Sequence, residues 1–272
     1  MNTKPGVVKR FVVPVVAQRE VAEDHFELEL ARPEALGDPV PGQFVSVLCR
    51  SAEGYDPLLR RPFSIYRVEA DTFSVLYRAA GRGTRILSRA RPGERVDMLG
   101  PLGRGFDIAP AQTGGRAILV GGGVGVPPIF HLAQVLSRRG VAVEACLGFA
   151  SSRRAFGLAQ WRRLGVEPQV ATDDGSLGRR ALVTELLHEA FERGAAPVFA
   201  CGPRPMLAAV VQLAQAAGVP VQVAMEEWMA CGVGACLSCV CRVRTEHGTA
   251  WARVCREGPV FDGYKVVWSD GC

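Results

Sequence analysis

The sequence predicts three parts: an N-terminal antiparallel β-barrel in residues 1–110, an α/β domain with a parallel sheet in residues 111–224, and a small C-terminal subdomain in residues 225–272. Three observations carry this prediction. Short β-patterned runs fill the first part, strands and helices alternate in the second, and six of the nine cysteines lie in the third. The length of 272 residues also suits about two domains, at roughly 150 residues each.

The first part contains apolar runs that are separated by Pro and Gly turns. The expected strands are residues 11–17, 26–31, 44–48, 63–68, 73–78 and 95–99. Short strands at this close spacing are typical of an antiparallel barrel.

The second part alternates between strand and helix patterns. The expected strands are residues 117–120, 141–147, 170–172, 198–200 and 221–224, and the expected helices are 127–138, 182–193 and 206–217. Such alternation indicates a parallel sheet with helices on both faces. The last part shows little helical periodicity.

Composition and charge exclude several classes of protein. The net charge of +5 comes from 32 basic and 27 acidic residues without a long Lys/Arg block, which argues against nucleic-acid binding. The apolar run at residues 11–17 contains Pro14 and is far shorter than the ~20 residues of a membrane span, so no membrane association is expected. Without an export signal, the cysteines are expected in a reducing cytoplasm, where clustered cysteines more often bind metal than form disulfides.

Four cysteines have the spacing of a plant-type iron–sulfur site, C-x4-C-x2-C followed by a distant fourth ligand. The expected ligands are Cys231, Cys236, Cys239 and Cys255. Gly232 and Gly234 would let this loop turn sharply around a 2Fe-2S cluster. A zinc site with four thiolates and merely buried thiols remain as alternatives. We interpret Cys241 as structural and Cys49, Cys146 and Cys272 as core or tail residues.

A flavin signature lies at the start of an expected barrel strand. Arg60-Arg61-Pro62-Phe63-Ser64 resembles the Arg-x-(Tyr/Phe)-Ser motif of the ferredoxin reductase superfamily. The resemblance implies that Arg61 meets the FAD pyrophosphate, that Phe63 covers the flavin and that Ser64 acts catalytically at flavin N5. The same site is expected to include Pro62, Leu76, Tyr77 and Arg78, with Gly83 and Thr84 of a second anion-binding turn. Alone, the motif could also be an ordinary strand entry.

A glycine-rich turn follows the first strand of the second part. The expected nucleotide-binding residues are Gly121, Gly122, Gly123 and Gly125, because glycines let the backbone approach phosphates. Cys201, Gly202 and Pro203 belong to a segment that resembles the Cys-Gly-Pro-x-x-Met element, which implies that Cys201 lines the hydride-transfer site. The alternatives without a binding role are a tight βα turn for the glycine-rich segment and a buried thiol for Cys201.

The choice between NAD and NADP stays open at this point. No acidic residue stands obviously where the adenine ribose would be held. Arg153 and Arg154 could meet a 2′-phosphate or belong to a solvated loop.

Several segments together resemble the PyrK family. These are residues 225–236, 254–261, 58–62 and 172–176. The resemblance implies an oxidoreductase: the electron-transfer subunit of a class 1B dihydroorotate dehydrogenase in pyrimidine biosynthesis, with FAD, a 2Fe-2S cluster and NAD. It also implies an FMN-containing catalytic subunit as partner, in a heterotetramer with two copies of each. The alternatives are a subunit of an NADH-dependent ferredoxin:NADP oxidoreductase or hydrogenase diaphorase and, more distantly, a zinc-stabilised binding module without a redox role.

Overall fold

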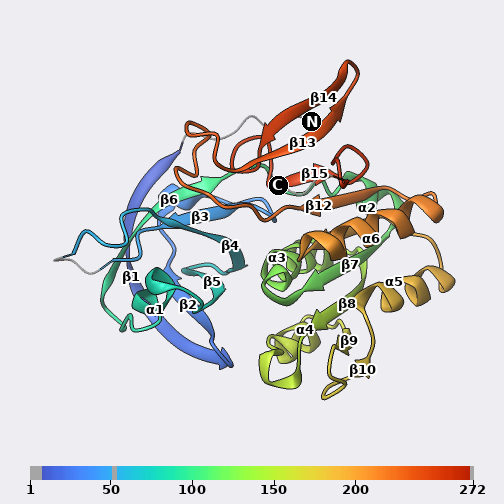
Figure 1. Cartoon of the computed structure of the whole chain (residues 1–272). Helices are drawn as coiled ribbons and strands as arrows, with labels where there is room; N and C mark the ends of the chain where they lie inside the picture. Colours follow the sequence, from blue (N-terminus) through green and yellow to red (C-terminus); the bar gives the residue numbers. More distant parts are fainter. Residues whose placement is uncertain (1–7, 51–53, 270–272) are drawn as a thin grey trace.

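The computed structural model describes residues 8–50 and 54–269, so Cys272 lies outside the described residues. Its N-terminal part is a closed barrel with the strand order β1-β2-β5-β4-β3-β6 (Figure 1). The strands are β1 (Lys9–Ala22), β2 (His25–Ala31), β3 (Phe44–Val47), β4 (Arg61–Val68), β5 (Thr72–Arg78) and β6 (Arg95–Leu102). All pair antiparallel, so the predicted barrel is confirmed. Short helices η1 (Glu34–Leu36) and α1 (Arg82–Leu87) join them.

The barrel encloses its own apolar core because its strands alternate between an inward and an outward face. Val45 of β3, Ile65 of β4, Val75 of β5 and Met98 of β6 are fully buried in this core. On β4 the alternation buries Phe63 and Ile65 inside, so Ser64 between them faces outward. The barrel therefore presents the polar part of its motif to the outside.

The second part is a seven-stranded sheet with the order β10-β9-β8-β7-β11-β12-β15. Its strands are β7 (Arg116–Gly122), β8 (Ala142–Phe149), β9 (Gln169–Thr172), β10 (Arg179–Arg180), β11 (Val198–Cys201), β12 (Val221–Ala224) and β15 (Val260–Asp262). All neighbours run parallel except β12 and β15, which confirms the predicted parallel sheet. The edge strand β15 comes from the C-terminal stretch and extends this sheet.

Helices cover both faces of the sheet. They are α2 (Ala109–Gly114), α3 (Val126–Arg138), α4 (Leu158–Arg163), α5 (Val183–Glu192) and α6 (Arg204–Ala216), with the short η2 (Gly123–Gly125) and η3 (Ser152–Arg154). On β7, Ala117 and Leu119 pack on the α3 side, whereas Ile118 and Val120 pack on the α5 and α6 side. A strand that is buried on both faces explains the continuous apolar run at this position.

Helix α3 joins the barrel to the sheet. Every residue from Val126 to Gln134 is buried, because the helix packs on β7 and β8 from one side and on β4 from the other. The ring of Phe130 lies 5.1 Å from that of Tyr66 in β4 and 5.2 Å from that of Trp161 in α4. The two parts are therefore joined through a packed aromatic interface.

The C-terminal stretch forms loops and a hairpin of β13 (Val240–Thr245) and β14 (Gly248–Arg253), which projects from the rest of the molecule (Figure 1). Its loops pack on the barrel: the Arg104 N–H donates to the Gly258 carbonyl at 2.5 Å. Within residues 8–50 and 54–269, no helix combines the length and the apolar character that a membrane crossing requires.

Candidate functional site

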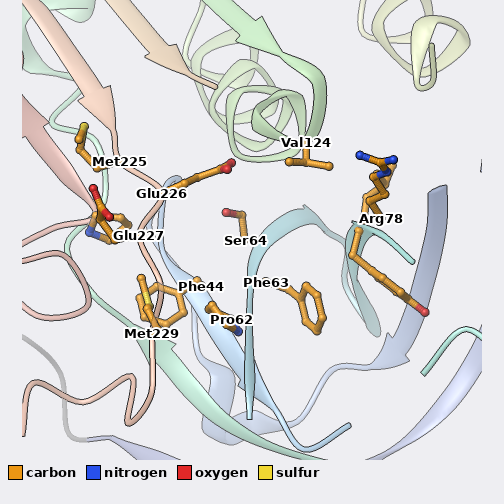
Figure 2. A pocket seen from close by; sticks show the side chains of 13 residues that line it. Phe44, Pro62, Phe63, Ser64, Arg78, Val124, Met225, Glu226, Glu227 and Met229 are labelled. Atoms are coloured by element: carbon orange, nitrogen blue, oxygen red, sulfur yellow. The ribbon is translucent and has the colours of Figure 1, made fainter. Parts of the chain in front are cut away.

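A cavity of about 280 Å³ opens between the barrel and the segment that leaves β12 (Figure 2). Its lining combines residues from the barrel, the glycine-rich turn and the C-terminal stretch: Phe44, Pro62, Phe63, Ser64, Leu76, Tyr77, Arg78, Val124, Met225, Glu226, Glu227, Met229 and Pro259. The structure thus brings together six of the sequence-predicted flavin residues, Pro62, Phe63, Ser64, Leu76, Tyr77 and Arg78.

The barrel wall of this cavity comes from β4 and β5, which pair antiparallel. The rings of Phe63 and Tyr77 lie 5.0 Å apart and are tilted by 43° against each other, and both belong to the apolar part of the lining. Ser64 and Glu226 point into the same part of the cavity (Figure 2). Partial desolvation by the cavity walls raises the pKa of Glu226 above its usual value, although the side chain remains exposed to the cavity.

Two arginines at the barrel side carry charge that no carboxylate neutralises. Arg61 donates only to the backbone carbonyls of Leu59 and Arg60, and neither Arg61 nor Arg78 forms an ion pair within the described residues. Arg60, in contrast, is paired with Asp97 at 2.8 Å. Arg78 lines the cavity, whereas Arg61 does not. Guanidinium groups next to this apolar wall fit the pyrophosphate of a flavin dinucleotide.

Gly83 and Thr84 lie outside the cavity, in the first turn of α1. A Cβ atom at Gly83 would lie 3.2 Å from side-chain atoms of Cys49 and Pro57, so this glycine permits close packing. The Gly81 N–H donates to Thr84 Oγ1 at 3.0 Å and caps the helix. The first-turn N–H groups have no intrahelical acceptor.

The glycine-rich turn separates this cavity from a second cleft of about 450 Å³. Val124 lines the first cavity, whereas Gly122, Gly123 and Pro203 line the second. Gly123 has φ +53°, which favours glycine. The second cleft is at the carboxyl ends of β7, β8 and β9, where open parallel sheets bind nucleotides.

Four of the predicted nucleotide residues line neither cavity: Gly121, Gly125, Cys201 and Gly202. A Cβ atom at Gly125 would lie 2.3 Å from the Cys201 carbonyl oxygen, so the turn and the end of β11 are in direct contact. Burial, and then the charge of Glu226, raise the pKa of Cys201 well above that of a free thiol.

The four predicted metal-binding cysteines lie in two pairs. Although burial opposes it, hydrogen bonds from the backbone and from the Cys236 thiol lower the pKa of Cys231 to about 6. The N–H groups of Val233 and Ala235 donate to Cys231 Sγ at 3.4 and 3.3 Å. Gly232 and Gly234, with φ of +69° and +86°, allow the chain to turn around this sulfur.

The second pair is Cys239 and Cys255. The Cys255 N–H donates to Cys239 Sγ at 3.4 Å. Burial, followed by the hydrogen bond and charge of Cys239, raises the pKa of Cys255 to about 12. Within the part of the chain that the structure describes, no three His, Cys, Asp or Glu side chains converge as the ligands of a single metal ion would. Cys241 is fully buried in β13.

Sequence reasoning missed seven lining residues of the first cavity: Phe44, Val124, Met225, Glu226, Glu227, Met229 and Pro259. The sequence could have indicated the run Met225 to Met229 as part of the site, because this run leads from the last parallel strand directly to the cysteine loop. No sequence pattern indicated Pro259, since it reaches the cavity only through the packing of the C-terminal stretch against the barrel.

Comparison with known proteins shows which proteins the chain is similar to. A model of the iron–sulfur cluster binding domain of dihydroorotate dehydrogenase B matches residues 226–267. The electron transfer subunit of dihydroorotate dehydrogenase B (NAD(+)) from Geobacillus thermodenitrificans is 44% identical over 266 residues, which cover 96% of this chain and 100% of that protein. The corresponding subunit from Enterococcus faecalis is 39% identical over 264 residues, covering 95% and 98%.

Solved structures share the fold. A structure described as an NADH-dependent reduced ferredoxin-NADP oxidoreductase has a TM-score of 0.81 and 27% identity, and the alignment covers 94% of this chain and 90% of that chain. The ferredoxin reductase of a carbazole 1,9a-dioxygenase has a TM-score of 0.64 at 20% identity, over 79% of this chain and 69% of its own, which shows a common fold alone.

Proposed function

The chain belongs to the family of electron transfer subunits of dihydroorotate dehydrogenase B, and from this premise we propose that it passes electrons between a catalytic FMN subunit and NAD+ through a 2Fe-2S cluster and FAD. It is an oxidoreductase subunit whose fold supports an iron–sulfur cluster, a flavin and a nicotinamide nucleotide. The finer identities of these groups, and the residues that hold them, are the proposal.

The observation that carries the proposal is the short connection between the cavity and the thiols. Met229 lines the cavity, and Cys231 is two residues further along the chain. Two residues span at most about 7 Å, even when fully extended. A cluster on this loop would lie beside any flavin in the cavity, and electron transfer requires such closeness.

The pairing of the cysteines favours two irons over zinc. In a 2Fe-2S cluster each iron takes two protein thiolates, which suits the pairs Cys231–Cys236 and Cys239–Cys255. A structural zinc ion would need four thiolates around one point. Backbone N–H groups directed at Cys231 and Cys239 also suit sulfurs that carry negative charge.

The cavity supports FAD as the flavin. Arg61 and Arg78 are free to neutralise a pyrophosphate, with Gly83 and Thr84 of the α1 turn nearby in sequence. Pro62, Phe63, Leu76 and Tyr77 offer an apolar wall, and Ser64 offers a hydroxyl to the flavin ring. A bound flavin supplies the conversion between the hydride of a nicotinamide and the single electrons of a cluster.

The second cleft supports NAD as the nucleotide. Gly122 and Gly125 let the turn lie close to α6 and to the end of β11, because a Cβ atom on either would clash there. We propose that the nucleotide site also includes Gly121, Gly123, Gly202 and Pro203. The relatives carry NAD(+) in their names. We also propose that Cys201 borders the hydride-transfer site, and its backbone packs against Gly125 of the turn.

The family supports the remaining proposals. We propose an FMN-containing catalytic subunit as partner, in a heterotetramer with two copies of each chain. We also propose that this complex works in the cytoplasm. We also keep the division into residues 1–110, 111–224 and 225–272 as functional units that bind FAD, NAD and the cluster.

Anaerobic co-expression with the catalytic subunit tests the function. The purified complex should be brown-yellow and contain about two irons for each FAD of this chain. NADH should bleach the flavin and cluster absorption, and dihydroorotate should do the same through the partner. Folded complex that contains neither iron nor FAD would overturn the proposal.

A second candidate is the subunit of an NADH-dependent ferredoxin:NADP oxidoreductase, which the TM-score of 0.81 favours. The two differ in partner. Co-purification with a larger flavoprotein in place of an FMN protein would support this candidate.

A further inference from the structure

The turn between β1 and β2 connects the barrel to the edge of the nucleotide cleft. Glu23 lies in this turn, and its carboxylate accepts a hydrogen bond from Arg153 Nη2 at 3.1 Å and lies 3.8 Å from Arg154 Nε. The Glu23 N–H also donates to the Arg153 carbonyl at 2.9 Å. The ring of His25 packs 5.3 Å from that of Phe156. This turn is therefore docked on η3 by backbone, charge and ring contacts.

Arg153 and Arg154 lie a few residues after a segment that lines the cleft. Phe149 and Ala150, at the end of β8, form part of the lining, and η3 begins two residues later. These arginines are the cations nearest in sequence to Phe149 and Ala150, whereas Arg180 and Arg204 adjoin lining residues on other walls of the cleft. Arg153 and Arg154 are both drawn toward the barrel by the same carboxylate of Glu23.

Asp173 lines the cleft from the next strand. It follows β9, and its N–H donates to the Phe149 carbonyl at 3.1 Å, which fixes the backbone beside the end of β8. The neighbouring Asp174 is turned to Ser176, whose hydroxyl it binds at 2.6 Å. The side chain of Arg180 packs over Gly175 and does not line the cleft. The charged group on this wall is thus a carboxylate.

We propose that the barrel helps to choose the dinucleotide: Glu23 holds Arg153 and Arg154 away from the cleft, and Asp173 meets the adenosine ribose. A free ribose 2′-hydroxyl can donate to a carboxylate, whereas a 2′-phosphate is repelled by it and needs the arginines that Glu23 retains. The inference rests on the proposed nucleotide cleft and adds a residue from another part of the fold to its selectivity.

Binding of adenosine 5′-phosphate and adenosine 2′,5′-bisphosphate to the complete complex tests this without any electron transfer. Isothermal titration gives the ratio of the two dissociation constants. Glu23→Gln should shift this ratio about threefold toward the bisphosphate, because exposed ion pairs are weak. Asp173→Asn should shift it about tenfold, because it removes a charge beside the phosphate.

Two further variants make the test specific. Glu167→Gln breaks an exposed pair with Arg162 on the same domain and should leave the ratio unchanged. Adding Arg153→Gln and Arg154→Gln to Glu23→Gln should return the ratio to that of the parent protein. An unchanged ratio in Glu23→Gln, with normal binding of the 5′-phosphate, overturns this inference alone. If neither compound binds the parent complex, the proposed nucleotide cleft falls as well.

Discussion

Two neighbouring arginines at the entry to β4 have different partners. Arg60 is paired with Asp97, and both side chains are largely buried, whereas Arg61 has only backbone acceptors among the described residues. The Arg-x-Phe-Ser motif predicts Arg61 as the arginine that meets the phosphate. The ion pair of Arg60 leaves Arg61 as the available cation.

Arg61→Gln should therefore lower FAD affinity by about tenfold or more, since a charge-assisted contact to phosphate is lost. The measurement is the flavin content after dialysis, with the thermal unfolding temperature as a check on folding. Arg60→Gln should lower the unfolding temperature and keep the flavin. Equal flavin loss in both variants would contradict the division of roles.

Single substitutions of the cysteines test which thiols bind the cluster. Cys239→Ser should abolish the visible absorption of the cluster, because a ligand of one iron is lost. Cys241→Ser should keep it, because that thiol is buried in the core behind the loop. Absorption spectra of anaerobically purified variants decide this. Loss of the cluster in Cys241→Ser would show that the ligand set is wrong.

At the scale of elements, the glycine-rich turn depends on contact with the end of β11. Gly125→Ala should destabilise the protein by about 1–3 kcal/mol, because the added Cβ overlaps the Cys201 backbone. Gly114→Ala is the matched control, since a Cβ there meets nothing within 4 Å and the site is helical. That variant should be neutral or slightly more stable. Urea unfolding midpoints compare them, and equal values would refute the packing argument.

The order and type of the main elements could be predicted from the sequence, but several small ones could not. The expected strand at residues 11–17 is the centre of β1 (Lys9–Ala22), and the helix at 127–138 matches α3. Helix α4 and strand β15 were not predicted. Strand β15 has three residues, and too few apolar positions exist there to show a period. Its place depends on the open edge of β12.

At the scale of the whole molecule, helix α3 places the titratable side chain of His131 in the packed region between the barrel and the sheet. Burial, followed by the charge of Arg138, lowers the pKa of His131 from 6.5 to about 4. The unfolded chain therefore binds this proton more readily than the folded protein. The stability that depends on neutral His131 is complete above pH 6.5 and is lost as the pH falls toward 4.

When the pH falls from 7 to 5.5, protonation of His131 in the unfolded chain should lower the free energy of unfolding by roughly 1 kcal/mol. His131→Gln should remove that part of the pH dependence, as measured by urea unfolding at both pH values. His188→Gln, at an exposed position on α5, should leave it unchanged. Parallel pH profiles for the parent protein and His131→Gln would contradict the assignment.

The surface beside the cysteine loop should contribute to assembly with the catalytic subunit. Trp228 is 91% exposed and Leu237 is 61% exposed, and both flank the loop. Trp228→Ser should weaken co-purification with the catalytic subunit while the cluster absorption stays the same. Val16→Ser, at an exposed apolar position of β1, is the control. Unchanged assembly in Trp228→Ser would exclude this residue from the interface.

The barrel, the parallel sheet and the candidate cluster ligands could be predicted from the order of the amino acids alone. These depend on local periodicity and on the spacing of residues close in the chain. The packing of the folded chain was needed to show that Glu226 and Met229 share a cavity with Ser64 and that Glu23 pairs with Arg153. It was also needed to show that Arg60 is paired, whereas Arg61 forms no ion pair among residues 8–50 and 54–269. Such contacts join residues far apart in sequence, and they form only when the barrel, the sheet and the C-terminal loops bury their apolar surfaces against one another.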